Sequence, residues 1–140
     1  MGDRSSLWTL YTRFDNDTDL RRGPFGLDTF RRNLVSLNAI CREHHAKVVL
    51  GTFQYYKPWA EIHRDQTWAD AWEHGLAREN DIIRALADSD DNIWCADVAR
   101  SFVPTPEHMV DFCHLTTLGN RLIARAFFDT IEAMRREAER

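Results

Sequence analysis

Lysine is scarce in this sequence, and acidic residues outnumber basic ones. Of the 140 residues, 18 are Lys or Arg and 22 are Asp or Glu, so the formal net charge is −4 at pH 7. The only lysines are Lys47 and Lys57. A nucleic-acid backbone is held by clustered positive charge, which this composition does not supply. We therefore expect no DNA or RNA partner.

Long apolar runs are also absent. The longest is the short stretch around Val48 to Leu50, whereas a membrane span needs about 18 or more apolar residues, so we expect no membrane span. The segment from Met1 to Ser6 lacks the apolar core of a signal peptide, and the chain as written is expected in the cytoplasm. A longer precursor with a leader would leave that location open. Gly2 with Ser6 matches the loose myristoylation pattern, which often arises by chance.

Cysteines are few, and their spacing matches no paired motif. Cys41, Cys95 and Cys113 are an odd number with no Cys-x-x-Cys motif, so the sequence predicts neither a disulfide framework nor a thiolate zinc site. Cys41 and Cys95 are interpreted as core residues. Histidines are more frequent, but none are spaced as His-x-x-x-His on a predicted helix, so we expect no metal and no other cofactor. The histidines considered for such a site are His44, His45, His63, His74 and His108.

What is present is the composition of one ordinary soluble domain, with 44% hydrophobic and 29% charged residues. Two short, β-branched apolar runs have no polar alternation, which is typical of parallel strands covered on both faces. Amphipathic stretches with polar caps separate them, so the fold class is α/β. We expect helices over 5–14, from Asp28 to about His45, from Thr67 to about Asp88, and from Thr116 or Thr117 to about Glu137, and strands over 47–53 and 92–98.

The candidate chemistry lies after the second predicted strand. In open α/β sheets, ligands collect beyond the carboxyl ends of the strands, so residues 99–117 should border any site. Asp111 and His114 lie there, three residues apart and just ahead of the last helix. A carboxylate bonded to one imidazole nitrogen leaves the other nitrogen free to accept a proton from a hydroxyl nucleophile. This pair therefore predicts a general base.

The surroundings of this pair carry a family resemblance. The stretch from Phe30 to Phe127 resembles the C-terminal half of the SGNH or GDSL hydrolases, a family of esterases, lipases and carbohydrate deacetylases. The matching segments are Phe30–Leu34, Val48–Thr52, Asn80–Ala87, Ala96–Val98 and, most specifically, Asp111–Ala124. The resemblance implies a three-layer α/β/α, flavodoxin-like parallel sheet, of which this chain holds the C-terminal portion with about two strands and four helices.

The resemblance also implies roles for the two site residues. In a Ser-His-Asp triad of this family, His114 would be the general base and Asp111 its orienting carboxylate. The implied reaction is acyl transfer from a small ester, such as an acyl ester or an acetylated sugar, to water through an acyl-enzyme. No metal or organic cofactor takes part in it.

The upstream blocks of the family are missing. Gly2-Asp3-Arg4 has Arg where the nucleophile Ser would stand, and no Gly-x-Asn-Asp occurs in the chain. Loss of one oxyanion donor alone reduces the rate by about 10²- to 10³-fold. We therefore expect residues 1–140 to form a single incomplete domain. It is a truncated gene product, a split protein whose missing N-terminal half comes from a partner chain, or a remodelled member of the family that has lost its chemistry. The alternative is a non-catalytic binding or assembly module that pairs the open edge of the first strand with a partner.

Other residues near the predicted rim have competing interpretations. Cys113 is a weak substitute nucleophile, because adjacent side chains in a turn usually point apart. Asp97 could replace Asp111 as the orienting acid, although we prefer a structural hydrogen-bonding role for it. Ser101 is the one hydroxyl near the rim, but it is a poor nucleophile candidate because it does not lie on a strand-to-helix elbow. The aromatic residues after the first strand, Tyr55, Tyr56 and Trp59, either line a substrate cleft or pack on one another in a loop. Trp68 and Trp72 are expected in the core.

Overall fold

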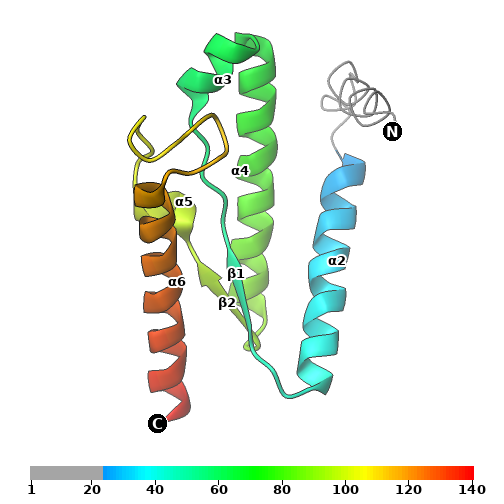
Figure 1. Cartoon of the computed structure of the whole chain (residues 1–140). Helices are drawn as coiled ribbons and strands as arrows, with labels where there is room; N and C mark the ends of the chain where they lie inside the picture. The colour runs from blue at the N-terminus through cyan, green and yellow to red at the C-terminus, as the bar shows by residue number, and fades with distance from the viewer. Residues whose placement is uncertain (1–23) are drawn as a thin grey trace, which may run out of the picture.

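A computed structural model describes residues 24–140, in which two parallel strands are combined with long helices in an α/β arrangement (Figure 1). Both predicted strands and the three long predicted helices within this range are present. The predicted helix over 5–14 lies outside the described residues, as do Gly2 and Ser6. The elements are α2 (Pro24–Glu43), β1 (Val48–Gly51), α3 (Lys57–His63), α4 (Gln66–Ser89), β2 (Ile93–Ala96), α5 (Val98–Ser101) and α6 (Thr117–Ala138).

The two strands pair in parallel, in a register that runs from Val48 opposite Ile93 to Gly51 opposite Ala96. The pairing continues one step further, because the Thr52 amide donates to the Ala96 carbonyl at 3.1 Å. Parallel strands need a long crossover, and α3 and α4 supply it. So short a ladder is not stable alone, and its stability comes from the helices packed on it.

Helices cover both faces of this sheet. On one face, Val48 and Ile93 are buried together with Leu86 of α4. On the other face, Gly51 lies directly under the ring of Phe127 of α6. The layers are therefore helix, sheet and helix, with α2 and α4 on one side and α6 on the other (Figure 1). The residues that pack around the buried cluster are Leu34, Cys41, Leu50, Ile82 and Ala87.

A polar cluster ties α2 to the turn between α4 and β2. The buried Asn38 side chain donates to Asp90 at 2.8 Å and accepts a hydrogen bond of 2.8 Å from Asn92. Arg42 pairs with Asp90 and, at 3.0 Å, with Asp91. The backbone N–H of Asn92 is the largest cause that lowers the pKa of Asp90. The cluster therefore adds hydrogen bonds and ion pairs to the apolar contacts that Leu34 and Cys41 of α2 make with the core.

Some helix ends differ from the sequence prediction. Helix α2 begins at Pro24 rather than at Asp28, because proline suits the first helical position, where its missing N–H needs no partner. Helix α4 is capped by Asp65, which accepts from the Trp68 amide at 2.8 Å, and it continues through Gly75. Thr116 caps α6 as predicted, accepting from the Gly119 amide at 3.2 Å.

The segment over 54–66, for which the sequence predicts neither helix nor strand, contains the short helix α3, so the prediction is wrong there. Its seven residues are too few to show a helical period in the sequence. Tertiary contacts stabilise it: Ala60 is fully buried. At its start, Lys57 forms ion pairs with Asp70 and, at 2.9 Å, with Glu73 of α4. The helix thereby positions the chain that leaves β1.

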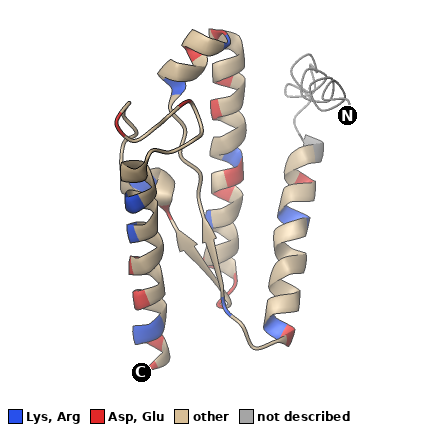
Figure 2. Cartoon of the chain, in the orientation of Figure 1, with Lys and Arg blue, Asp and Glu red and all other residues tan. Residues whose placement is uncertain are grey.

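The long helices carry both charge signs. In Figure 2, both basic and acidic residues lie along α6. Two of its arginines form local ion pairs: Arg125 with Asp129 at 3.0 Å, and Arg135 with Glu139, the residue after the helix, at 2.7 Å. No helix among residues 24–140 is long and apolar enough to cross a membrane.

Two glycine substitutions test the three-layer packing. A Cβ at Gly51 would lie 2.5 Å from the Phe127 ring, whereas a Cβ at Gly75 would meet nothing within 4 Å. Gly51→Ala is expected to lower the free energy of unfolding by about 1–3 kcal/mol through overpacking. Gly75→Ala, the matched control, should raise it by about 1 kcal/mol through helix propensity. Urea denaturation measures both values, and equal effects would contradict the packing of α6 on β1.

Candidate active site

The predicted site residues lie in the loop that joins α5 to α6. This loop and the segment after β1 meet at the carboxyl ends of the two strands (Figure 1). The Tyr56 amide, five residues beyond β1, donates to the Phe112 carbonyl at 3.0 Å. The candidate site is therefore at the edge of the sheet where the sequence predicted it.

The loop is closed by its own backbone. Met109 and Leu115 form an isolated antiparallel bridge, and the Val110 amide donates to the His114 carbonyl at 2.7 Å. Met109 is almost fully buried. The Thr116 amide then donates to the His108 carbonyl at 2.9 Å. These bonds leave Asp111 to His114 as the tip of a tight turn.

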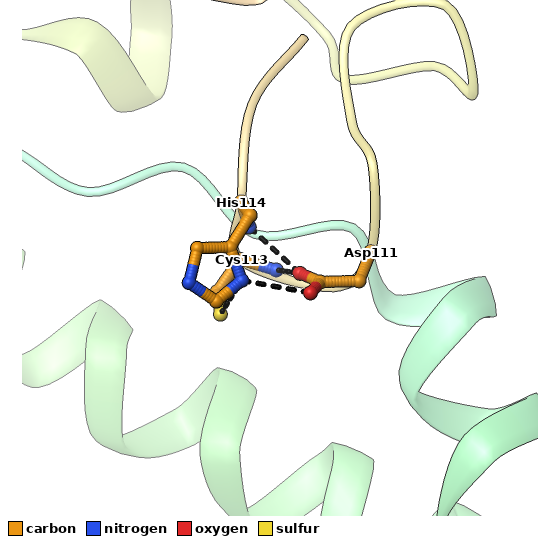
Figure 3. Close-up of side chains that lie close together, drawn as sticks. All are labelled: Asp111, Cys113 and His114. Carbon is orange, nitrogen blue, oxygen red and sulfur yellow. Dashed lines mark hydrogen bonds and ion pairs between the residues drawn. The ribbon is translucent and has the colours of Figure 1, made fainter.

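Asp111 and His114 are brought together as predicted. Nδ1 of His114 lies 2.7 Å from Oδ2 of Asp111 (Figure 3). The other carboxylate oxygen, Oδ1, accepts from the backbone amides of Cys113 at 2.9 Å and His114 at 2.7 Å. One carboxylate therefore orders the turn and orients the imidazole.

The charge state of Asp111 follows from these bonds. Burial raises the pKa of Asp111, but the amides of Cys113 and His114 and the imidazole together outweigh burial and hold this pKa at about 2. The carboxylate is therefore ionised at neutral pH and only accepts hydrogen bonds. Nδ1 of neutral His114 carries the proton, and Nε2 is left as the acceptor. This is the tautomer that a general base requires.

The imidazole is open to solvent. The His114 side chain is 76% exposed and that of Asp111 is 35% exposed. Within residues 24–140, the hydrogen bonds of the His114 ring are made to Asp111 and Cys113. Ser101, the hydroxyl considered near the rim, donates to the Val98 carbonyl at 2.8 Å and closes the end of α5. The described residues therefore give His114 no hydroxyl partner.

Cys113 lies closer to the pair than the sequence predicted. Its Sγ is 3.5 Å from Nδ1 of His114, so the two adjacent side chains do not point apart (Figure 3). Because Asp111 accepts both backbone amides, the turn is tight enough to bring them to one side. Burial, followed by the charge of Asp111, raises the pKa of the Cys113 thiol to about 11. The free thiol is therefore protonated at neutral pH and is a poor nucleophile.

Asp97 has the structural role preferred from the sequence. Its carboxylate accepts two hydrogen bonds of 2.8 Å from Arg84 and one of 2.9 Å from Thr52. The Arg84 guanidinium is the main reason that the pKa of Asp97 is lowered. The Thr52 hydroxyl also accepts from the Ala99 amide at 2.8 Å. This network joins the ends of β1 and β2 rather than orienting an imidazole.

A buried amide that sequence reasoning missed holds the segment after β1. Asn80 of α4 accepts from the Phe53 amide at 2.8 Å and donates to the Phe53 carbonyl at 3.0 Å. Next along the chain, Gln54 donates to the carbonyls of Val98 at 3.0 Å and Phe102 at 2.6 Å. A polar residue inside the apolar stripe of α4 was the signal that could have identified Asn80.

Aromatic side chains pack beside the loop that holds Asp111 and His114. Trp68 and Trp72 are half-buried and stacked at 5.0 Å between ring centroids, and Phe112 meets Trp68 edge-on at 5.3 Å. Tyr55 donates its hydroxyl to the Ala69 carbonyl at 3.2 Å, and burial is the main cause that raises its pKa to about 12. The Trp59 ring lies 5.5 Å from that of His63. Trp59 therefore packs within α3, whereas Tyr55 is bonded to α4.

A surface hollow of about 320 Å³ lies elsewhere, beside β2 and the end of α6. It shares no residue with the loop that holds Asp111 and His114. The candidate site therefore rests on the geometry of that loop. The residues that line the hollow are Ala87, Asp88, Asp91, Ile93, Trp94, Cys95 and Glu137.

Comparisons with known proteins identify no family for this chain. No protein-family model, curated protein or solved structure matches the chain.

Acid stability tests the hydrogen bonds of Asp111. Because its pKa is lowered from 3.8 to about 2, its contribution to stability is complete above pH 4 and is lost as the pH falls towards 2. Asp111→Asn should remove this part of the pH dependence, so the wild type and the variant should converge in stability at low pH. Urea denaturation between pH 2 and 6 measures the difference. A difference that does not change with pH would contradict the ionised, hydrogen-bonded carboxylate.

Proposed function

We propose that Asp111 and His114 form the base half of a serine ester hydrolase of the SGNH type. The observation that carries the proposal is the 2.7 Å bond from Nδ1 of His114 to the ionised Asp111, which leaves Nε2 free and exposed. A hydroxyl nucleophile loses its proton to a base arranged in this way. The free nitrogen is the atom on which the chemistry depends.

The arrangement of layers supports the finer assignment to a flavodoxin-like domain. A parallel pair of strands lies between helices, and the loop with Asp111 and His114 is at the carboxyl ends of those strands. This is where ligands bind in open α/β sheets. The proposed complete sheet has about five strands, of which β1 and β2 are the last two.

The proposed reaction divides between this chain and a completing polypeptide. A serine oxygen from that polypeptide attacks the ester carbonyl while Nε2 of His114 takes the hydroxyl proton. Asp111 stabilises the imidazolium that forms. The imidazolium then protonates the departing alcohol, and a water molecule, deprotonated by the same nitrogen, releases the acid from the serine. The oxyanion donors also come from the completing polypeptide, and the substrate class is a small ester.

The DNA that precedes the codon for Met1 provides the first test. A reading frame there with Gly-Asp-Ser and Gly-x-Asn-Asp would identify the completing polypeptide. Produced with this chain, it should hydrolyse p-nitrophenyl esters, and His114→Ala should reduce turnover by about 10²- to 10⁴-fold, the usual contribution of a general base. His74→Ala, at an exposed position on α4, is the matched control. Turnover that does not depend on His114 would contradict the proposal.

The isolated chain gives a complementary result. We expect the chain not to react with a fluorophosphonate probe, because no serine among residues 24–140 is hydrogen-bonded to an imidazole. Labelling of Ser101, together with turnover that is lost in His114→Ala, would show that the nucleophile lies in this chain. Mass spectrometry of the labelled peptides identifies the serine.

A second candidate function is a non-catalytic assembly module. One edge of β1 has no partner strand among residues 24–140, and α2 exposes Val35, Leu37 and Ile40. An unpaired edge beside apolar side chains is a site for association. Association that is unchanged in His114→Ala, combined with no catalysis by any assembled form, would favour this module. Analytical ultracentrifugation and ester turnover measured on the same samples distinguish the two functions.

A further inference from the structure

Three different donor atoms converge at the tip of the loop. Asp111, Cys113 and His114 each offer one ligand atom, and these atoms all lie within 4.8 Å of one another. Figure 3 shows the sulfur, the imidazole and the carboxylate gathered at the same turn. The cysteine is the member that the general-base mechanism does not use.

The donors are arranged so that binding need not disturb the turn. Oδ1 of Asp111 already accepts the amides of Cys113 and His114, whereas Oδ2 faces Nδ1 of the imidazole. The Sγ of Cys113 is 3.5 Å from the same nitrogen. An ion placed between Oδ2, Nδ1 and Sγ would therefore leave the backbone bonds to Oδ1 intact.

The separations approach those of a tetrahedral zinc site. Zinc ligands at 2.0–2.3 Å in tetrahedral geometry are separated from one another by about 3.3–3.7 Å. The separation of 3.5 Å between Sγ and Nδ1 already falls in this range. The oxygen and nitrogen, now 2.7 Å apart, would have to move apart by about 0.6 Å. A rotation of the exposed His114 ring is sufficient for such a movement.

We propose that Asp111, Cys113 and His114 bind a Zn²⁺ ion through Oδ2, Sγ and Nδ1, with the fourth position open to water. Thiolate and imidazole ligands select zinc over calcium and magnesium, which take oxygen ligands. Because the His114 side chain is 76% exposed, an ion from solution reaches the donors directly.

Binding rearranges the protons of the site. Bonds form from zinc to sulfur, nitrogen and oxygen, while the S–H bond of Cys113 and the Nδ1–H bond of His114 break. Nε2 takes up one proton, so the neutral imidazole is retained in its other tautomer, and the thiol proton is released to solvent. With Nε2 protonated, His114 cannot accept a proton from a hydroxyl. Zinc therefore switches off the general base. This consequence rests on the proposed function, whereas the binding of zinc itself does not depend on it.

Cobalt spectroscopy tests the site without any catalytic assay. Titration of the metal-free chain with Co²⁺ should produce thiolate-to-cobalt charge-transfer absorption and the visible bands of a tetrahedral ion, and Zn²⁺ should abolish both. Cys113→Ala should lose the charge-transfer band while keeping the Asp111–His114 bond. Cys41→Ala, which changes a cysteine outside the loop, is the matched control and should keep the spectrum. In His114→Ala, affinity should fall by more than the roughly 10- to 100-fold typical of a lost outer-shell partner.

Nitrogen NMR of the wild type follows the imidazole itself. On addition of Zn²⁺, the proton of His114 should move from Nδ1 to Nε2. A cobalt spectrum without charge transfer, a spectrum unchanged in Cys113→Ala, or an Nδ1 that keeps its proton with saturating zinc would each overturn the site. Zinc binding by a chain whose completed form has no esterase activity would refute the proposed function and leave the metal site standing.

Discussion

The Asp111 carboxylate is the group on which the candidate site depends. It accepts hydrogen bonds from the backbone amides of Cys113 and His114 and from the ring nitrogen Nδ1 of His114. The same carboxylate therefore shapes the turn and sets the tautomer of the imidazole. Its ionisation follows from the same three bonds, which outweigh the effect of burial. A neutral amide in its place would keep the size of the side chain but lose the charge that stabilises an imidazolium.

The fold positions this turn through contacts on either side of it. Phe112 packs against Trp68 of α4, and its carbonyl accepts from the Tyr56 amide at 3.0 Å. At the other end, a side chain at Gly119 would overlap the His108 carbonyl, so α6 can start close to the loop only with glycine there. The turn is thus held between the segment that follows β1 and helix α6, which covers the face of the sheet opposite to α4.

The features of the fold and of the candidate site that could be predicted from the sequence are formed by residues close together in the chain. The spacing of Asp111 and His114 is three residues, and a single turn is enough to bring them together. The strands are visible as apolar runs for the same reason. By contrast, Asn38 meets Asp90 across 52 residues, and α3 is stabilised by contacts with α4. The direction of the Cys113 side chain could not be predicted, because it depends on where the backbone amide of Cys113 is bonded.

The proposed base and the proposed zinc site compete for one nitrogen. Nδ1 of His114 either donates its proton to Oδ2 of Asp111 or gives its lone pair to a metal ion, and the two states carry opposite tautomers. Three groups bind the metal but only two form the base, so Cys113 separates the two states chemically. A hydrolase that needed only the base would function equally well with alanine at position 113. In the proposed zinc site, the cysteine sulfur, which lies 3.5 Å from that nitrogen, would therefore act in control of the base rather than in catalysis.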